Sequence, residues 1–363
     1  KIRIGYLSAN FCEHPVSYLL SRVLELHDSS SFEIYAYSFN NSNNDKYTRR
    51  IRKCVNIFKD IDGLDDNTAV NEIRSDNLDI AIDLMGYTKR NRMNIFSKRI
   101  APVQISFLDY PGTTGAKCID YLLADKSIIP VEDEKFYSEK IIHLPYTVQC
   151  NDNTLLSSKI TFSRNEIGLP DDAFVFCNFA RNSKISSKEY DIWMELLSLN
   201  ENSMLWLLES NPIAKDNLIY EAKIRNIDQS RILFSKKIPI EQHISRQKCA
   251  DLFLDTFNYN SGFMTQLAIK SGLPILTLRG NSFSSRISTS ILYSLGLEEL
   301  VASNKKQYKS MAKDLSINKI KYQLLKNKLF IQSSNSPYFD SQIYTTNLES
   351  AYKSTLTNSE TNC

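Results

Sequence analysis

The sequence predicts an α/β fold of two doubly wound, Rossmann-like domains. Short apolar runs of strand length alternate with stretches of helical period along almost the whole chain, which is typical of mostly parallel sheets with helices on both faces. A polar stretch at 151–163 interrupts this alternation near the middle, and 363 residues suit two domains of ordinary size. Because open α/β sheets bind ligands at the carboxyl ends of their strands, we expect the domains to face each other across a cleft lined by those ends.

In the first half, a βα alternation begins at once, and the interpretation of each run follows its length and period. Strands are expected at 2–8, 32–37, 78–84, 101–108, 121–124 and 140–143, with helices at 17–26 and 66–74. The polar run at 40–45 is expected to be a short loop. We assign residues 1–155 to an N-terminal domain.

A second alternation follows the polar stretch. Strands are expected at 174–179, 204–208, 232–234, 252–255 and 274–277, and helices at 187–199, 216–225, 241–250, 263–271 and 285–295. Trp193 and Trp206 are expected to be packing residues. Residues 156–335 form the C-terminal domain, with a short polar loop at 333–336. The remainder, 336–363, contains an amphipathic helix at 342–355 that we expect to pack back on the first domain.

Composition excludes several classes of protein. With 44 basic and 41 acidic residues the net charge is +3, which gives no reason to expect nucleic acid or an anionic membrane as the main partner. No run of eighteen apolar residues exists, so no membrane span is expected. Seven cysteines without a CxxC pair favour a reduced, cytoplasmic chain, and four scattered histidines argue against a zinc enzyme. GxSxG, Walker-type and GxGxxG motifs are absent.

A cationic run follows the strand expected at 174–179. It carries Arg181 and Lys184 and leads into a helix from about Ser187. A helix N-terminus beside the carboxyl end of a strand favours an anion, and two cations there favour a phosphate. The alternative is a loop with two solvated charges.

The first domain offers candidate residues in three loops at strand ends. His14 lies in the first βα loop, where it can act as a general base or donate to a sugar hydroxyl or phosphate; the alternative is a histidine that caps backbone carbonyls. Pro15 suits the first turn of the next helix. Pro111, Gly112 and Thr113 follow the strand at 101–108, and the loop at 86–90 is expected at the same sheet edge.

The second domain offers two further groups. His243 and Arg246 share one helix face, either as ligand-binding residues or as a solvated pair. The segment Asn260, Ser261, Gly262, Phe263 and Met264 opens a helix after a strand and is a candidate anion-binding helix start, as is the run 282–286.

Several motifs in a fixed order resemble one family along nearly the whole chain. They are the His-Pro loop at 14–15, Ala-Pro-Val-Gln at 101–104, Tyr-Pro-Gly-Thr at 110–113, Tyr-Ser-Glu-Lys at 137–140, Asn-Phe at 178–179 with Lys-Ile at 184–185, Ser-Ser-Arg at 284–286 and Ser-Pro at 336–337. This pattern resembles the catalytic region of O-linked N-acetylglucosamine transferases, the SPINDLY-like glycosyltransferases.

The resemblance implies a GT-B fold and inverting transfer of a sugar from a nucleotide sugar, typically UDP-GlcNAc, to Ser or Thr of an acceptor protein. No metal or separate cofactor is implied. The resemblance also implies tetratricopeptide repeats ahead of this region, and the absence of the insertion found in eukaryotic members between the two lobes favours a bacterial form. The N-terminal lobe would face the acceptor and the C-terminal lobe would hold the nucleotide sugar.

Residue roles carry over from the resemblance to matching positions. Lys184 matches the lysine that meets the donor diphosphate, and His14 matches a histidine near the reacting sugar. Arg181 would lie beside the same phosphate and His243 and Arg246 near the nucleotide. Pro111, Gly112 and Thr113 match the sugar-side loop.

One segment departs from the family pattern. The family places His-Thr-Thr at the diphosphate-binding helix start, followed by an Asp for the ribose, whereas this chain has Gly262, Phe263, Met264 and Leu267 there. Three alternatives follow. Arg181 compensates for the loss, or the donor is a different one (another hexose, fucose or a CMP-linked nonulosonic acid for flagellin), or the chain is a non-catalytic module that binds a protein.

Overall fold

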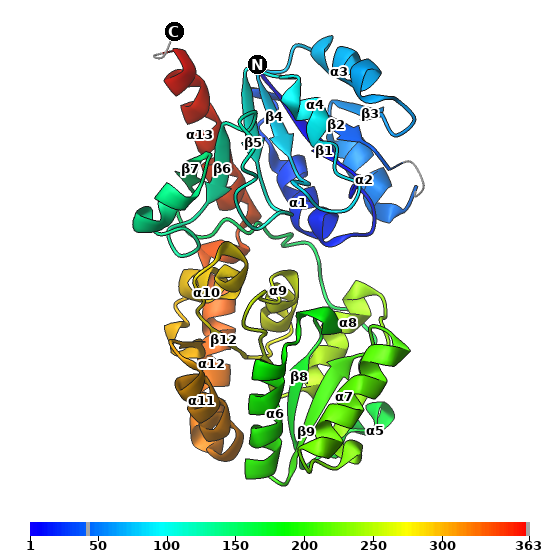
Figure 1. Ribbon diagram of the computed structural model, residues 1–363, viewed down its shortest axis with the longest axis vertical. Coiled ribbons are helices and arrows are strands. Elements are labelled where there is room, and N and C mark those ends of the chain that lie inside the picture. The colour runs from blue at the N-terminus through cyan, green and yellow to red at the C-terminus, as the bar shows by residue number, and fades with distance from the viewer. Residues whose placement is uncertain (41–43, 361–363) are drawn as a thin grey trace. The chain divides into compact units, whose positions relative to one another are not determined.

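The computed structural model describes residues 1–40 and 44–360. The chain forms two compact units, one of Lys1–Thr154 with Pro337–Cys363 and one of Leu155–Ser336 (Figure 1). Residues 41–43 of the polar run expected as a loop at 40–45, and Cys363, lie outside the described residues.

The first unit is built on a seven-stranded parallel sheet in the order β3-β2-β1-β4-β5-β6-β7. Its strands are β1 (Ile2–Ser8), β2 (Phe32–Ser38), β3 (Ile57–Asp60), β4 (Ile80–Asp83), β5 (Val103–Ser106), β6 (Tyr121–Ala124) and β7 (Lys140–His143). Its helices are α1 (Pro15–Leu26), α2 (Lys46–Cys54), α3 (Asp66–Arg74), α4 (Met93–Ser97) and α13 (Ser341–Glu360). The strand order reverses between β1 and β4, which is the point where a doubly wound sheet opens a crevice for a ligand.

The second unit has a six-stranded parallel sheet in the order β10-β9-β8-β11-β12-β13. Its strands are β8 (Phe174–Asn178), β9 (Ser203–Leu208), β10 (Ile232–Ser235), β11 (Leu252–Leu254), β12 (Ile275–Leu278) and β13 (Val301–Ala302). Its helices are α5 (Arg164–Ile167), α6 (Ser187–Leu199), α7 (Pro212–Ile224), α8 (Ile240–Arg246), α9 (Phe263–Lys270), α10 (Ile287–Ser294), α11 (Lys305–Ile317) and α12 (Lys319–Asn335). Here the reversal lies between β8 and β11.

The burial of the strands explains why they could be predicted from the sequence. Parallel strands covered by helices on both faces are buried along their whole length, so they appear as continuous apolar runs. All four residues of β4 and of β5 are buried. Trp193 and Trp206 are almost fully buried, which confirms that they are packing residues.

Several sequence expectations were wrong in detail. The polar run 333–336 is not a loop, because α12 continues to Asn335 and the hydroxyls of Ser333 and Ser334 donate to the carbonyl of Phe330 within the helix. The helix expected at 241–250 ends at Arg246 and continues as the 3₁₀ turn η4 (Gln247–Cys249). The elements α2, β3, α4, α5, β13, α11 and α12 were not expected. Within the described residues no helix combines the length and the apolar character needed to cross a membrane.

Helix α13 returns the end of the chain to the first unit, where it contacts β1 and α1 (Figure 1). The hydroxyls of Tyr352 and Tyr6 lie 3.1 Å apart, and the Tyr6 hydroxyl lies 2.8 Å from Nε2 of His27. On its other side the His27 ring is 2.9 Å from the carboxylate of Glu349. A buried polar chain therefore connects α13, α1 and β1.

Candidate functional site

The turn after β8 brings Lys184 to the edge of the second sheet. Asn178, the last residue of β8, donates through its side-chain amide to the carbonyl of Leu254 at 2.7 Å. Asn182 begins the 3₁₀ turn η2 (Asn182–Lys184), donates to the carbonyl of Leu208 at 2.9 Å and accepts from the amide of Ser210. Two buried asparagines therefore fix the path of the backbone before Lys184.

The ammonium group of Lys184 is held by the loop that follows β11. Its Nζ donates to the carbonyl of Asn260 at 2.9 Å and lies 3.9 Å from the centre of the Tyr259 ring. Burial lowers the pKa of Lys184 to about 8; Arg181 lowers it further, while Asp255 opposes the shift. Asp255 only partly compensates the positive charge of Lys184, and a bound anion would raise the pKa of Lys184 again by favouring its charged form.

Asp255 organises that loop. Its buried carboxylate accepts hydrogen bonds from the amides of Thr256 and Ser261 at 2.9 and 2.8 Å and from the hydroxyl of Thr277 at 2.8 Å. The side-chain amide of Asn260 donates to the carbonyl of Thr256, and this hydrogen bond within the loop helps to fix the backbone carbonyl of Asn260 that accepts from Lys184.

The loop ends at the N-terminus of α9. Gly262 is the N-cap of this helix with φ +56°, a left-handed conformation that glycine adopts without steric cost. Phe263 and Met264 form the first turn, and the amide of Met264 bonds to the carbonyl of Ser261. The ammonium of Lys184 is thus bound two residues before the N-cap, and both groups favour an anion.

His243 and Arg246 are both buried, so the interpretation as a solvated pair was wrong. Arg246 donates through Nε to Nδ1 of His243 at 2.9 Å and through Nη1 to the carbonyl of Lys236. The imidazole meets the ring of Phe179 edge-on, at 5.0 Å between centres. Burial first, and then the charge of Arg246, lowers the pKa of His243 to about 3. The ring is neutral and, because Nδ1 accepts, its proton is on Nε2.

The remaining cation of the run, Arg181, differs from Lys184. Its side chain is exposed and makes no hydrogen bond or ion pair with the described residues. It is close enough to affect the pKa of Lys184.

In the first unit, His14 is the N-cap of α1. Its Nδ1 accepts from the amide of Val16 at 3.3 Å, and Pro15 occupies the first turn as expected. The ring therefore caps a backbone amide, and the alternative interpretation, a histidine that caps backbone carbonyls, was wrong. With Nδ1 as an acceptor, the proton of the neutral ring is on Nε2, which favours hydrogen-bond donation over proton abstraction.

The loops after β1, β4 and β5 contact one another. Asn10 donates to the carboxylate of Asp109 at 3.2 Å, and the rings of Tyr87 and Tyr110 meet edge-on at 5.6 Å. Gly86 has φ +50°, and a Cβ atom there would lie 2.3 Å from Cβ of Tyr110. Only glycine permits this close approach of the two loops.

Thr113 is held by a buried carboxylate. Its hydroxyl donates to Glu139 at 2.6 Å, and the amide of Thr114 donates to the same group at 2.6 Å. Burial alone would raise the pKa of Glu139, but these hydrogen bonds outweigh it and lower the pKa. Pro111 and Gly112 lie half-buried just before, with the amide of Gly112 bonded to the carbonyl of Tyr110.

Comparison with known proteins identifies the family. The sequence model of the family described as Glycosyl transferase family 41 matches residues 1–162 and 151–348. The chain belongs to glycosyltransferase family 41. This confirms the resemblance drawn from the motifs.

Relatives of this family-41 chain include much longer proteins. It is 31% identical over 358 residues to a protein of Arabidopsis thaliana named probable UDP-N-acetylglucosamine–peptide N-acetylglucosaminyltransferase SEC, covering 97% of this chain and 37% of that protein. It is 25% identical over 461 residues to a Caenorhabditis elegans UDP-N-acetylglucosamine–peptide N-acetylglucosaminyltransferase, covering 96% and 40%. The chain thus spans well under half of these curated relatives.

Solved structures establish the fold class. An O-GlcNAc transferase mutant of Thermobaculum terrenum matches with a TM-score of 0.92 at 26% identity, covering 100% of this chain and 69% of that one. A protein from Anabaena, Alr3699/HepE, solved with UDP and glucose, matches with a TM-score of 0.65 at 11% identity, covering 97% and 100%, and shares the fold alone. The predicted GT-B class of the family-41 chain is confirmed.

Sequence reasoning missed three residues in the candidate sites of the two units. Asp83 is the last residue of β4 and Asp255 directly follows β11, and a carboxylate at the end of a buried strand is a signal that the sequence does contain. Glu139 belongs to the Tyr-Ser-Glu-Lys motif at 137–140, but no function was predicted for it. Asp83 accepts from the amides of Met85 and Gly86, and burial raises its pKa to about 6.

Proposed function

We propose that this chain is the catalytic region of a protein O-glycosyltransferase that moves a GlcNAc-like sugar from a UDP-linked donor to Ser or Thr of an acceptor protein, with inversion and without a metal. The observation that carries the proposal is the partly buried ammonium of Lys184, which a hydrogen bond to the Asn260 carbonyl holds near the N-cap of α9. The names of the relatives support the donor and acceptor classes.

The leaving group determines the role of Lys184. As the bond from the anomeric carbon to the diphosphate oxygen breaks, negative charge grows on the departing nucleoside diphosphate. A preorganised ammonium and the start of a helix stabilise that charge in a site with little water. Lys184 and the N-terminus of α9, at Gly262 and Phe263, supply both groups, and Arg181 adds a further positive charge.

Other residues bind and orient. We assign the nucleotide to the side of His243 and Arg246, where the neutral His243 carries a buried Nε2 proton for which the described residues provide no acceptor. We assign the sugar side to Pro111, Gly112 and Thr113, and a donor role near the reacting sugar to Nε2 of His14. The acceptor hydroxyl attacks the anomeric carbon and gives up its proton to a base that these residues do not identify.

A cytoplasmic location is part of the proposal. All six cysteines within the described residues are free thiols, as a reducing compartment would keep them.

Lys184→Met, with Lys188→Met as a control, tests the proposal. Lys188 is exposed on α6, four residues further along the chain. Intact-mass spectrometry of acceptor proteins co-expressed with each variant should show a hexosamine increment for the wild type and for Lys188→Met, and a loss of about 10²–10³ in rate for Lys184→Met.

Calorimetry with UDP-GlcNAc, UDP-glucose, GDP-fucose and CMP identifies the donor. Binding of both UDP compounds, weakened by Lys184→Met, is expected. Binding of CMP or GDP-fucose alone would overturn the UDP donor, and unchanged acceptor modification by Lys184→Met would overturn catalysis through this site.

A further inference from the structure

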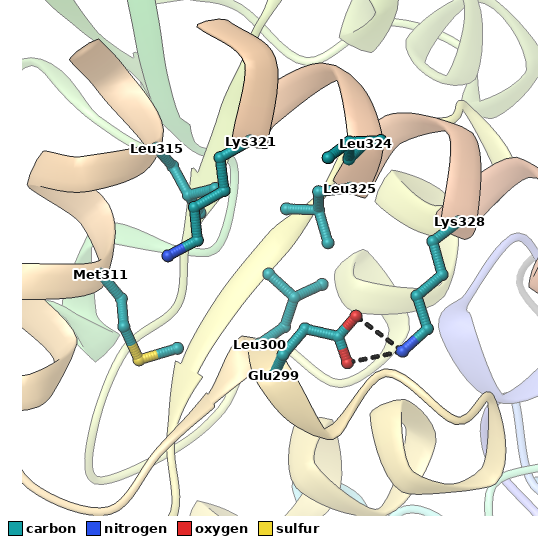
Figure 2. Close-up of a pocket in the computed structure, with 8 residues that line it drawn as sticks. All are labelled: Glu299, Leu300, Met311, Leu315, Lys321, Leu324, Leu325 and Lys328. Atoms are coloured by element: carbon teal, nitrogen blue, oxygen red, sulfur yellow. Dashed lines mark hydrogen bonds and ion pairs between the residues drawn. The ribbon is translucent and has the colours of Figure 1, made fainter. Parts of the chain in front are cut away.

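A groove runs between α11 and α12 on the second unit. Its first part has a cavity volume of about 270 Å³, and Figure 2 shows the side chains that surround it. The apolar lining consists of Leu300, Met311, Leu315, Leu324 and Leu325. We call this feature, together with its continuation, the α11–α12 groove.

The groove continues into a polar part. A second hollow of about 330 Å³ shares Met311 and Lys321 with the first, so the two are continuous. Ser310, Lys313, Asp314 and Ile317 complete its lining. One end of the groove therefore offers apolar contact and the other offers charged and polar groups.

Apolar side chains are exposed at this surface. Leu324 is 64% exposed and Ile320, one turn earlier on α12, is 77% exposed, and Ile317 at the end of α11 is exposed as well. Single exposed apolar residues need no explanation, but a cluster beside an apolar cavity marks an interaction site.

The surrounding segment is strongly basic. Residues 298–335 contain eight lysines against Glu298, Glu299 and Asp314, a net charge of +5, whereas the whole chain has only +3. Among the residues that line the groove, the three lysines Lys313, Lys321 and Lys328 exceed the two carboxylates by one. At the rim, Lys328 pairs with Glu299 at 2.7 Å and Lys321 pairs with Asp314. Lys313 has no ion pair within the described residues. A partner with carboxylates complements this surface.

We propose that the α11–α12 groove binds an acidic amphipathic helical segment of a partner protein. An apolar side chain of the segment fills the cavity lined by Leu315, Leu324 and Leu325. The carboxylates of the segment form ion pairs with Lys313 and compete with Asp314 and Glu299 for the lysines at the rim. This is the helix-in-groove mode, in which apolar anchors about one turn apart enter the groove.

Two other occupants fit less well. A second copy of this chain would bring α12, with four lysines and no acidic residue, against itself. A lipid surface is flat and anionic, whereas this site is concave and carries Glu299 and Asp314 on its rim. The inference does not depend on the proposed function, because none of the lining residues belongs to the candidate donor site.

Selection from a displayed library of peptides of about four helical turns tests the proposal. The wild-type chain is the target, and Leu324→Asp serves for counter-selection; Leu324 is exposed, so the variant is expected to fold, and thermal unfolding verifies this. Enriched peptides should carry Asp or Glu around apolar residues spaced by three or four. Fluorescence anisotropy with a synthetic copy of the most enriched peptide should show a Kd that rises at least about tenfold with Leu324→Asp or Lys313→Glu and increases with salt.

Ile331→Asp is the matched control, since Ile331 is exposed on the same helix but does not line the groove. Its Kd should equal that of the wild type. Enriched peptides without acidic character, or equal binding to Leu324→Asp, would overturn the proposal. Binding to vesicles containing about one-third phosphatidylserine, with no acidic peptide enriched, would make the surface a membrane site instead and would also overturn it.

Discussion

In the proposed function, the two ring nitrogens of His14 have separate tasks. Nδ1 accepts from the amide of Val16 at the start of α1, which leaves the proton of the neutral ring on Nε2. Capping a helix end contributes about 1 kcal/mol to folding, and a positioned proton donor contributes about 10²–10⁴ to rate. Substitutions can separate these two contributions.

His14→Asn and His14→Ala form a test pair. Asparagine is a good N-cap, so His14→Asn should unfold near the wild-type temperature, whereas His14→Ala should lose about 1 kcal/mol. Both variants lack Nε2, and kcat/KM should fall about a hundredfold in both. Thermal unfolding and initial rates supply the two readouts. A variant His14→Asn with full activity would show that the ring acts only as a cap.

The lowered pKa of Lys184 predicts proton uptake on donor binding. The folded value of about 8 lies below the ordinary 10.5, so burial of the charged form costs stability below pH 8, and this cost disappears above pH 10.5. A bound diphosphate favours the charged form and raises the pKa. At pH 8.5, UDP binding should therefore take up a fraction of a proton.

Calorimetry in buffers of different ionisation enthalpy measures that uptake. The apparent enthalpy should vary between buffers for the wild type and should not vary for Lys184→Met. An enthalpy independent of the buffer in both proteins would place the diphosphate elsewhere.

At the scale of elements, both candidate sites lie at carboxyl ends of parallel strands and depend on loops that hold one another. In the second unit the turn after β8 meets the loop after β11 through Lys184 and Asn260. In the first unit the loop after β4 meets the loop after β5 at Gly86 and Tyr110. A side chain at position 86 should therefore displace the loop after β5, although position 86 itself is not proposed to contact a ligand.

Gly86→Ala tests this dependence. A Cβ would lie 2.3 Å from Cβ of Tyr110, and φ of +50° strains any residue with a side chain. We expect a loss of about 1–3 kcal/mol in the free energy of unfolding and weaker donor binding, because the displaced loop carries Pro111, Gly112 and Thr113. Gly63→Ala is the control, since no atom lies within 4 Å of the added Cβ. Denaturant unfolding compares the two, and equal stability would contradict the expected clash.

At the scale of the molecule, the first unit is discontinuous in sequence and the second is continuous. Helix α13 brings Tyr352 and Glu349 to Tyr6 and His27, across more than 300 residues of sequence. The first unit can therefore complete its core only when the end of the chain is present.

Tyr352→Ala should destabilise the first unit by about 3–5 kcal/mol, because it removes a fully buried ring and leaves Tyr6 without this partner. Ser350→Ala, at an exposed position of the same helix, should have little effect. Thermal unfolding should show the loss in one transition, while the transition of the second unit is unchanged. A similar loss in both variants would mean that the helix itself, and not the ring, determines the effect.

Burial explains which parts of this fold can be predicted from the sequence. Buried parallel strands could be predicted from the sequence because both faces of each strand are covered, and β4, β6 and β8 therefore form largely apolar runs. The helix through Ser333 was missed because its hydroxyls find partners inside the helix. The burial of Arg246 was not readable either, since its cost is offset by His243 and the carbonyl of Lys236, and these partners meet only in three dimensions.

The sequence alone determined the alternation of strands and helices, the fold class and the family, because each of these is written in local periodicity and in motifs of fixed order. Only the tertiary structure decided which groups carry charge and protons. Burial lowers the pKa values of Lys184 and His243, and Asp255 and Asn260 hold the loop that receives Lys184. Such effects depend on distance and loss of water between residues far apart in the chain, and no local pattern records them.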